Sequence, residues 1–344
     1  LKEFVAKRGC VVVLDPATGE LLAMANRPTF HLNKKDNLQE AAMNYALQGI
    51  YEPGSTFKIV GIGGALDQNL VSPQTMIFCH NGYYHEGHLK IPDHHPYGML
   101  SVSSVIKKSS NIGAFQITRQ LGVKRFFDYA ERFGFGQKTG ILLSGESSGI
   151  VRNTGNLIDF SRASYGYALN VTPLQVASAF AAIAHDGQRM KPQVVRAIVA
   201  NDGTVIERFD PEPVRRVIKK STAKQLREAM VRVVEEGGTA TRAAVPGFKV
   251  AGKTGTANRV IDTGYQEGHY TVSFAGMMPA QDPEFVCLVV IDDPLTDEVK
   301  RYGGTIAAPI FAKIAKRLGT HLNLQPTEPI EEEAADENQL ADTE

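Results

Sequence analysis

The sequence predicts an α+β fold in which strands from the two ends of the chain form one antiparallel sheet. Strand-like apolar runs occur near both ends, within 11–25 and 270–291, and helical spacing fills most of the region between them. Strands and helices do not alternate as they would in a parallel βαβ series. The 344 residues are 43% apolar, which is enough for a substantial core. We expect helices on both faces of the sheet and an inserted helical subdomain at about residues 70–190.

The N-terminal half begins with a predicted hairpin, because apolar runs at 11–14 and 21–25 flank the turn-rich sequence Asp15-Pro16-Ala17-Thr18-Gly19. A helical pattern opens at Pro53-Gly54-Ser55 and continues to about Gln68. Residues 76–100 are irregular and rich in Gly, Tyr, Pro and His. Helical spacing then returns twice, at 102–120 and 124–133.

The C-terminal half opens with a helix for which Thr172 is a candidate N-cap and Pro173 the first helical residue, ending at Gly187. A second helix is expected at 221–236. Strands follow, and the last two are joined by a proline-containing turn; they are predicted at 248–251, 270–277 and 285–291. A final helix fits 307–318. The early and late hairpins must meet in space to give a single sheet.

Charge and composition divide the chain into a domain at 1–325 and an acidic, disordered tail at 326–344. The tail carries eight acidic residues and no basic one, with little apolar surface to bury. Lys plus Arg equals Asp plus Glu, so nothing favours nucleic-acid binding. No apolar stretch approaches the roughly 20 residues that span a bilayer. The chain begins without Met or a signal peptide, and we expect a fragment or processed domain.

A candidate nucleophile lies at the predicted start of a helix, in Ser55-Thr56-Phe57-Lys58. Ser55 and Lys58 are one turn apart and therefore share a face. A neutral lysine there could take the serine proton, provided that burial or a second cation lowers its pKa. The helix N-terminus would favour an alkoxide or oxyanion. Alone, the motif recurs by chance, and it is more typical of a capped helix with an exposed lysine.

Two further short motifs follow along the chain. Ser109-Ser110-Asn111 comes after a lysine pair, and by itself it is typical of a helix cap or turn. Lys253-Thr254-Gly255-Thr256 follows an apolar run. On an edge strand, it would present a cation, hydroxyls and a backbone that Gly255 leaves open to a strand-like substrate. Lys253 could also be the second cation that lowers the pKa of Lys58.

The order S-x-x-K, S-x-N, K-T-G is the motif set of penicillin-binding proteins and serine β-lactamases. The chain resembles the transpeptidase domain of class B penicillin-binding proteins, of the division (FtsI-like) type. The resemblance covers about 9–318 and includes further matching segments, namely 9–24, 51–54, 165–175, 237–257 and 302–309. It implies the fold of the penicillin-binding proteins and serine β-lactamases.

The resemblance implies a D,D-transpeptidase acting on peptidoglycan stem peptides and acylated by β-lactams. Ser55 would be the nucleophile, Lys58 its general base, and Ser109 a proton relay. Asn111 would hold the donor amide. The substrate carboxylate would be bound by the third motif, and the backbone N–H groups of Ser55 and Thr256 would form the oxyanion hole; the third-motif residues are Lys253, Thr254, Gly255 and Thr256.

The resemblance also implies a cellular context. No metal or organic cofactor is expected. The parent protein would face the extracytoplasmic side of the bacterial membrane, held by an anchor absent from this chain. It would work with a glycan polymerase of the SEDS type and with division proteins.

Rival interpretations remain open from the sequence. A serine β-lactamase or penicillin-sensing receptor shares the motifs, but Asn111 replaces an aliphatic residue of class D enzymes, the chain has no Trp, and no deacylating Glu is identifiable. Residues 247–254 also fit the P-loop pattern G-x-x-x-x-G-K-[ST], although no helical spacing follows. Gly145–Gly149 fits a nucleophile elbow around Ser147, again with no helix after it.

Histidines concentrate beside Cys79 in the irregular segment. The cluster raises the possibility of a metal site, but its spacing matches no standard zinc motif; the residues are His80, His85, His88, His94 and His95.

Overall fold

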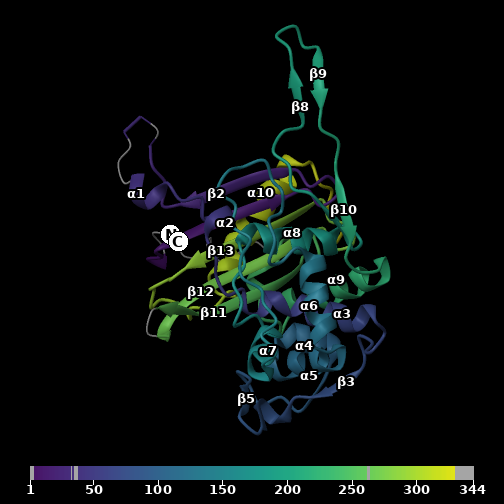
Figure 1. The fold of residues 1–344 in the computed structure, drawn as a ribbon. Coiled ribbons are helices and arrows are strands. Elements are labelled where there is room, and N and C mark those ends of the chain that lie inside the picture. Colours follow the sequence, from purple (N-terminus) through teal and green to yellow (C-terminus); the bar gives the residue numbers. More distant parts are fainter. Residues whose placement is uncertain (1–3, 32, 35–37, 262–263, 330–344) are drawn as a thin grey trace, which may run out of the picture.

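The computed structural model describes residues 4–31, 33–34, 38–261 and 264–329. Five antiparallel strands form the main sheet in the order β11-β12-β13-β1-β2 (Figure 1). The strands are β1 (Arg8–Leu14), β2 (Leu21–Arg27), β11 (Ala251–Ile261), β12 (Gly264–Met278) and β13 (Phe285–Asp292). Val12 pairs with Met24 of β2 on one side and with Leu288 of β13 on the other. The predicted union of the early and late hairpins is confirmed.

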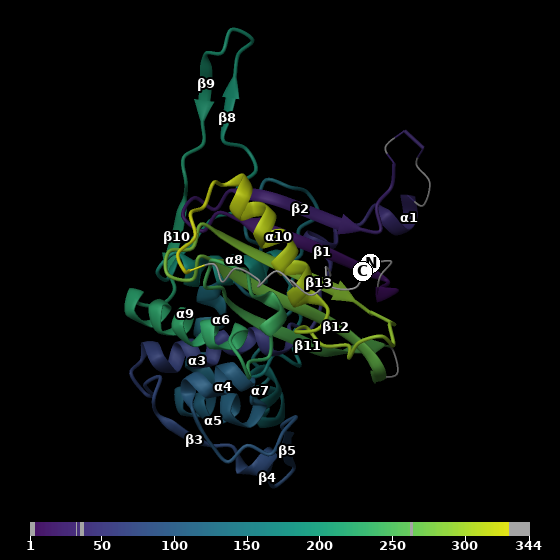
Figure 2. The same cartoon turned by 180° about the vertical axis from the view of Figure 1, so that it is seen from behind.

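Helices cover both faces of the sheet, as expected. Helix α8 (Pro173–Ala184) lies on the face seen in Figure 1, and α10 (Ala307–His321) lies on the opposite face in Figure 2. Phe311 of α10 packs on Phe274 of β12 with ring centroids 4.9 Å apart. The predicted start of α8 is confirmed, because Thr172 and Gln175 form a reciprocal capping box with Pro173 in the first turn. It ends at Ala184, a turn before Gly187.

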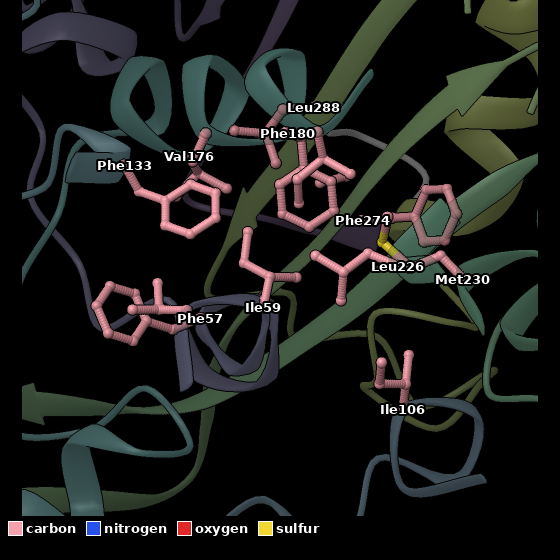
Figure 3. Packing of buried hydrophobic residues seen from close by; sticks show 14 of the residues in the cluster. Phe57, Ile59, Ile106, Phe133, Val176, Phe180, Leu226, Met230, Phe274 and Leu288 are labelled. Carbon is pink, nitrogen blue, oxygen red and sulfur yellow. The ribbon is translucent and has the colours of Figure 1, made fainter. Parts of the chain in front are cut away.

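The remaining helices pack together beside the sheet. They are α3 (Lys58–Asp67), α4 (Val102–Lys108), α5 (Asn111–Leu121), α6 (Val123–Phe133), α7 (Leu157–Ala163) and α9 (Lys220–Val234). Every residue of α3 is buried, and Figure 3 shows Ile59 of α3 among Phe133, Phe180 and Leu226 from three other helices. The single helix predicted at 102–120 is wrong, because the chain breaks into α4 and α5 at Ser109.

Short elements complete the described structure. The two short α-helices are α1 (Leu38–Ala41) and α2 (Tyr45–Gln48), and the 3-10 turns are η2 (Gly54–Phe57), η3 (His80–Gly82) and η4 (Thr241–Ala243). The small antiparallel pairs are β3 (Met76–Phe78) with β6 (Met99–Ser101), β4 (Tyr83–Glu86) with β5 (Leu89–Pro92), β7 (Gln188–Met190) with β10 (Pro213–Arg216), and β8 (Ala197–Val199) with β9 (Val205–Arg208). The β8–β9 hairpin, which the sequence analysis missed, projects away from the body (Figure 1).

Two boundaries differ from expectation. The strand predicted at 248–251 begins only at Ala251, so β11 contains the whole Lys253–Thr256 motif. The backbone N–H groups of Thr327 and Glu328 both donate to the carbonyl of Gly247, so the start of the segment predicted as a tail lies against the body. Its remainder, 330–344, lies outside the described residues. No helix in the described part of the chain is long and apolar enough to cross a membrane.

Candidate active site

Ser55 and Lys58 lie where a tight turn leads into a buried helix. Pro53 and Gly54 bring the chain into η2, and Gly54 has a positive φ of 55°. A Cβ on Gly54 would lie 2.9 Å from the carbonyl oxygen of Thr256, so this close approach to β11 requires glycine. The N–H of Lys58 donates to the carbonyl of Ser55. Side chains three residues apart in a 3-10 turn are nearly eclipsed, so Ser55 and Lys58 share one face.

Ser109 forms the corner between α4 and α5. It adopts the left-handed conformation, with φ 60° and ψ 34°, directly after the last residue of α4. Ser110 is the N-cap of α5, and its hydroxyl accepts from the N–H of Gly113 at 2.9 Å. Asn111 is the first residue of α5. The helix cap and the turn that the sequence predicted as alternatives are therefore both present. Together they place Ser109 and Asn111 beside Lys58.

The third motif lies on β11, an edge strand of the main sheet. A Cβ on Gly255 would lie 2.3 Å from Ser273 Oγ and 2.8 Å from the carbonyl of Pro53, so only glycine lets β11 pass this close to the Ser55 turn. The hydroxyl of Thr254 lies 3.0 Å from that of Thr239. Thr256 Oγ1 accepts from the N–H of Gly303 at 3.1 Å.

The three motifs meet at the Ser109 side chain. Lys58 Nζ donates to Asn111 Oδ1 at 2.8 Å, to the Ser109 carbonyl at 2.5 Å, and to Ser109 Oγ at 3.2 Å. Lys253 Nζ donates to the same Ser109 Oγ at 2.8 Å. Two lysines from distant parts of the chain thus share one hydroxyl, and each side chain is only 1% exposed.

Burial controls the charge of this pair. It lowers the pKa of Lys58 from an ordinary 10.5 to about 7, and the negative charge of Asp93 opposes that shift. The pKa of Lys253 is also lowered, first by burial and then by the charge of Lys58. Because burial penalises the charged form, a neutral Lys58 amine is available near neutral pH. Such an amine can accept a proton from a neighbouring hydroxyl.

Asp93 is the residue at this site that the sequence analysis missed. Its carboxylate accepts hydrogen bonds from Ser110, Asn111 and Ile112. It belongs to the irregular segment 76–100, in which only the histidines were candidate site residues. The 18 residues that separate it from Asn111 leave no local pattern linking the two.

The structure also bears on the rival motifs. A P-loop lysine precedes a helix, but here Lys253 and Thr254 lie inside an eleven-residue strand, which contradicts the NTPase interpretation. Ser147 lies in a loop, where its Oγ accepts from the N–H of Gly149 at 3.2 Å. Within the described residues, no group of three or more His, Cys, Asp or Glu side chains is placed to hold a metal. His80 instead packs against Tyr84, with ring centroids 4.8 Å apart.

Comparison with known proteins gives a consistent result. The family model described as the penicillin binding protein transpeptidase domain matches residues 9–316. The chain is 34% identical over 328 residues to the probable peptidoglycan D,D-transpeptidase PenA of Neisseria flavescens, covering 94% of this chain and 78% of that protein. It is 34% identical to the peptidoglycan D,D-transpeptidase FtsI of Escherichia coli, covering 93% of this chain and 53% of that protein.

The chain spans about half the length of FtsI and of several other curated relatives that it matches. A solved structure, penicillin-binding protein 3 from Mycobacterium tuberculosis in complex with aztreonam, matches with a TM-score of 0.83 at 32% identity. That match covers 94% of this chain and 75% of the other.

Proposed function

The chain belongs to the penicillin-binding protein transpeptidase family, and on this premise we propose that it is a peptidoglycan D,D-transpeptidase working through a serine acyl-enzyme. The observation that carries the proposal is that two buried lysines, Lys58 and Lys253, donate to the Ser109 hydroxyl, and that Lys58 lies one turn from the candidate nucleophile. β-Lactams would acylate the same serine, as substrate analogues.

Acylation begins when neutral Lys58 takes the proton of Ser55 Oγ. The oxygen attacks the penultimate D-Ala carbonyl, and the N–H groups of Ser55 and Thr256 stabilise the resulting oxyanion. As the tetrahedral intermediate collapses, the proton returns through the Ser109 hydroxyl to the leaving amine of the terminal D-Ala. An amine of a second stem peptide then attacks the ester and forms the cross-link. The proton that this amine loses passes to Ser55 Oγ as the ester bond breaks, which regenerates the serine.

Substrate binding uses the remaining motif residues. Asn111 donates from its amide to the donor peptide, since its Oδ1 is occupied by Lys58. Lys253 and the hydroxyls of Thr254 and Thr256 bind the terminal carboxylate. The outer edge of β11 pairs with the extended donor peptide, and Gly255 keeps that strand close to the Ser55 turn.

The proposed setting is the extracytoplasmic face of a bacterial membrane, with the domain held there by a longer parent protein. There it would work with a SEDS-type glycan polymerase and with division proteins. Co-purification of the parent with such a polymerase tests this context separately from the chemistry.

Intact-mass measurement after incubation with a penicillin tests the chemistry. We expect the wild type to gain one drug mass, Ser55→Ala to gain none, and Ser147→Ala to react like the wild type. An adduct on Ser55→Ala contradicts the proposal. Rapid release of hydrolysed drug from the wild type, in place of an adduct lasting minutes to hours, would identify a β-lactamase instead.

A further inference from the structure

The Asp93 carboxylate holds the start of α5 with both of its oxygens. Oδ1 accepts from the backbone N–H of Asn111 at 2.5 Å and from that of Ile112 at 3.2 Å. Oδ2 accepts from the hydroxyl of Ser110 at 2.5 Å. Hydrogen bonds to an ionised carboxylate are among the stronger ones in proteins, and a negative charge at a helix N-terminus is favourable. One side chain therefore fixes two of the three residues in the Ser109–Asn111 motif.

The β4–β5 hairpin in turn fixes Asp93. Asp93 directly follows β5, and its own N–H donates to the carbonyl of Gly82, just before β4, at 2.9 Å. The carbonyl of the preceding Pro92 accepts from Asn111 Nδ2 at 3.1 Å. This contact directs the Asn111 Oδ1 toward Lys58, where it accepts at 2.8 Å. The second N–H of the same amide stays available for a donor peptide.

Asp93 also contributes charge to the site. Its carboxylate is the principal group that raises the pKa of Lys58 against the effect of burial, with Cys79 acting in the same direction. Lys253 faces Lys58 from β11. The pKa of the neighbouring His94 is lowered, first by burial and then by the charge of Lys58. Asp93 is thus a negative charge that partly offsets the burial of Lys58.

We propose that Asp93 is a positioning residue for the transpeptidase reaction, which fixes the placement of Asn111 and supplies a negative charge to the Lys58 site. This inference rests on the proposed function. It assigns a role to the small β4–β5 hairpin, which carries no motif residue. Pro92 and Asp93, at the end of that hairpin, hold Asn111 in place through hydrogen bonds.

The test is the pH dependence of acylation by a penicillin whose own charge is constant between pH 6 and 8. A base with a pKa of about 7 makes the wild-type rate rise roughly tenfold over this range. Asp93→Asn removes the negative charge, so Lys58 loses its proton at lower pH. The ratio of the rates at pH 8 and pH 6 should then fall to at most about half the wild-type value. The maximal rate should fall by about tenfold or more, because the amide of the variant cannot accept all three hydrogen bonds.

Two further variants separate the two roles. Asp93→Glu keeps the charge but displaces the carboxylate, so the maximal rate should fall while the pH ratio stays near that of the wild type. Ser110→Ala keeps the charge and loses the hydrogen bonds of the Ser110 hydroxyl with Asp93 and with the N–H of Gly113, so the pH ratio should again be retained. A wild-type rate in Asp93→Glu overturns positioning, and a wild-type pH ratio in Asp93→Asn overturns the charge effect. If Asp93→Asn does not fold, the charge effect is tested with the two variants that keep the charge. A pH ratio in Asp93→Glu or Ser110→Ala that differs from that of the wild type overturns the charge effect. Failure of the wild type to acylate would instead refute the proposed function itself.

Discussion

Replacing Lys58 by methionine should abolish acylation and change how stability depends on pH. Lys58 is 1% exposed and its pKa in the folded protein is about 7, against 10.5 for an ordinary lysine. Between these two pH values the unfolded chain binds the extra proton, so the stability of the wild type rises with pH. Below pH 7 the ammonium is present in both states and the penalty for burying it is constant.

The magnitude follows from the linkage slope of about 1.4 kcal/mol per pH unit for one proton. Only half of this slope applies at pH 7, where folded Lys58 is half protonated, so between pH 7 and pH 9 the wild type should gain about 2.3 kcal/mol of unfolding free energy relative to Lys58→Met. The pKa of Lys253 is also lowered partly by Lys58. Removing Lys58 relieves that repulsion, so the variant retains less of the remaining pH dependence.

Urea unfolding followed by circular dichroism at pH 6, 7, 8 and 9 measures this difference. Lys90→Met is the matched control, since it removes an exposed lysine from β5. The two stability curves for wild type and Lys58→Met should diverge above pH 7. Parallel curves from pH 6 to pH 9 would show that Lys58 keeps its proton in the fold, and would refute its assignment as a base near neutral pH.

Two further substitutions test the architecture around the site. Gly255→Ala places a Cβ 2.8 Å from the Pro53 carbonyl, which costs about 1–3 kcal/mol and should lower the thermal midpoint by roughly 2–6 °C. Acylation should slow by about tenfold or more because Ser55 and Thr256 move apart; an unchanged rate would contradict the close approach. Thr172→Ala removes one half of the capping box. It should cost about 1 kcal/mol in urea unfolding with no change in the acylation rate, and an equal loss of activity would point to a role beyond stability.

The sequence predicts those features that short-range physics determines. The hairpin around 15–19 and the cap at Thr172 follow from local preferences, and both are present in the structure. The order of the three short motifs predicted one shared site, and their side chains share hydrogen bonds around Ser109. The catalytic roles of these residues remain predictions that the substitutions above test.

Features set by distant contacts were not predictable. Ser109 takes a left-handed conformation that glycine usually supplies, so helical spacing on both sides suggested one continuous helix. The apolar run predicted a strand only at 248–251, whereas β11 begins at Ala251 and pairing of Lys253 with Ala275 carries it on through Gly252 and Gly255. Asp93 reaches Asn111 only through the fold. The missed β8–β9 hairpin did carry a signal, since Asp202-Gly203 lies between apolar runs.

The central position of β1 has a consequence for the order in which the protein assembles. The ribosome releases the N-terminal residues first, so β1 and β2 emerge as a hairpin whose inner edge stays unpaired until β13 has been made. Such a hairpin is only marginally stable alone, and its open edge invites pairing with other chains. A nascent chain therefore carries an aggregation hazard until β13 has been made. The proposed nucleophile meets its second lysine only after β11 has been made, so a chain interrupted before β11 should be inert toward β-lactams.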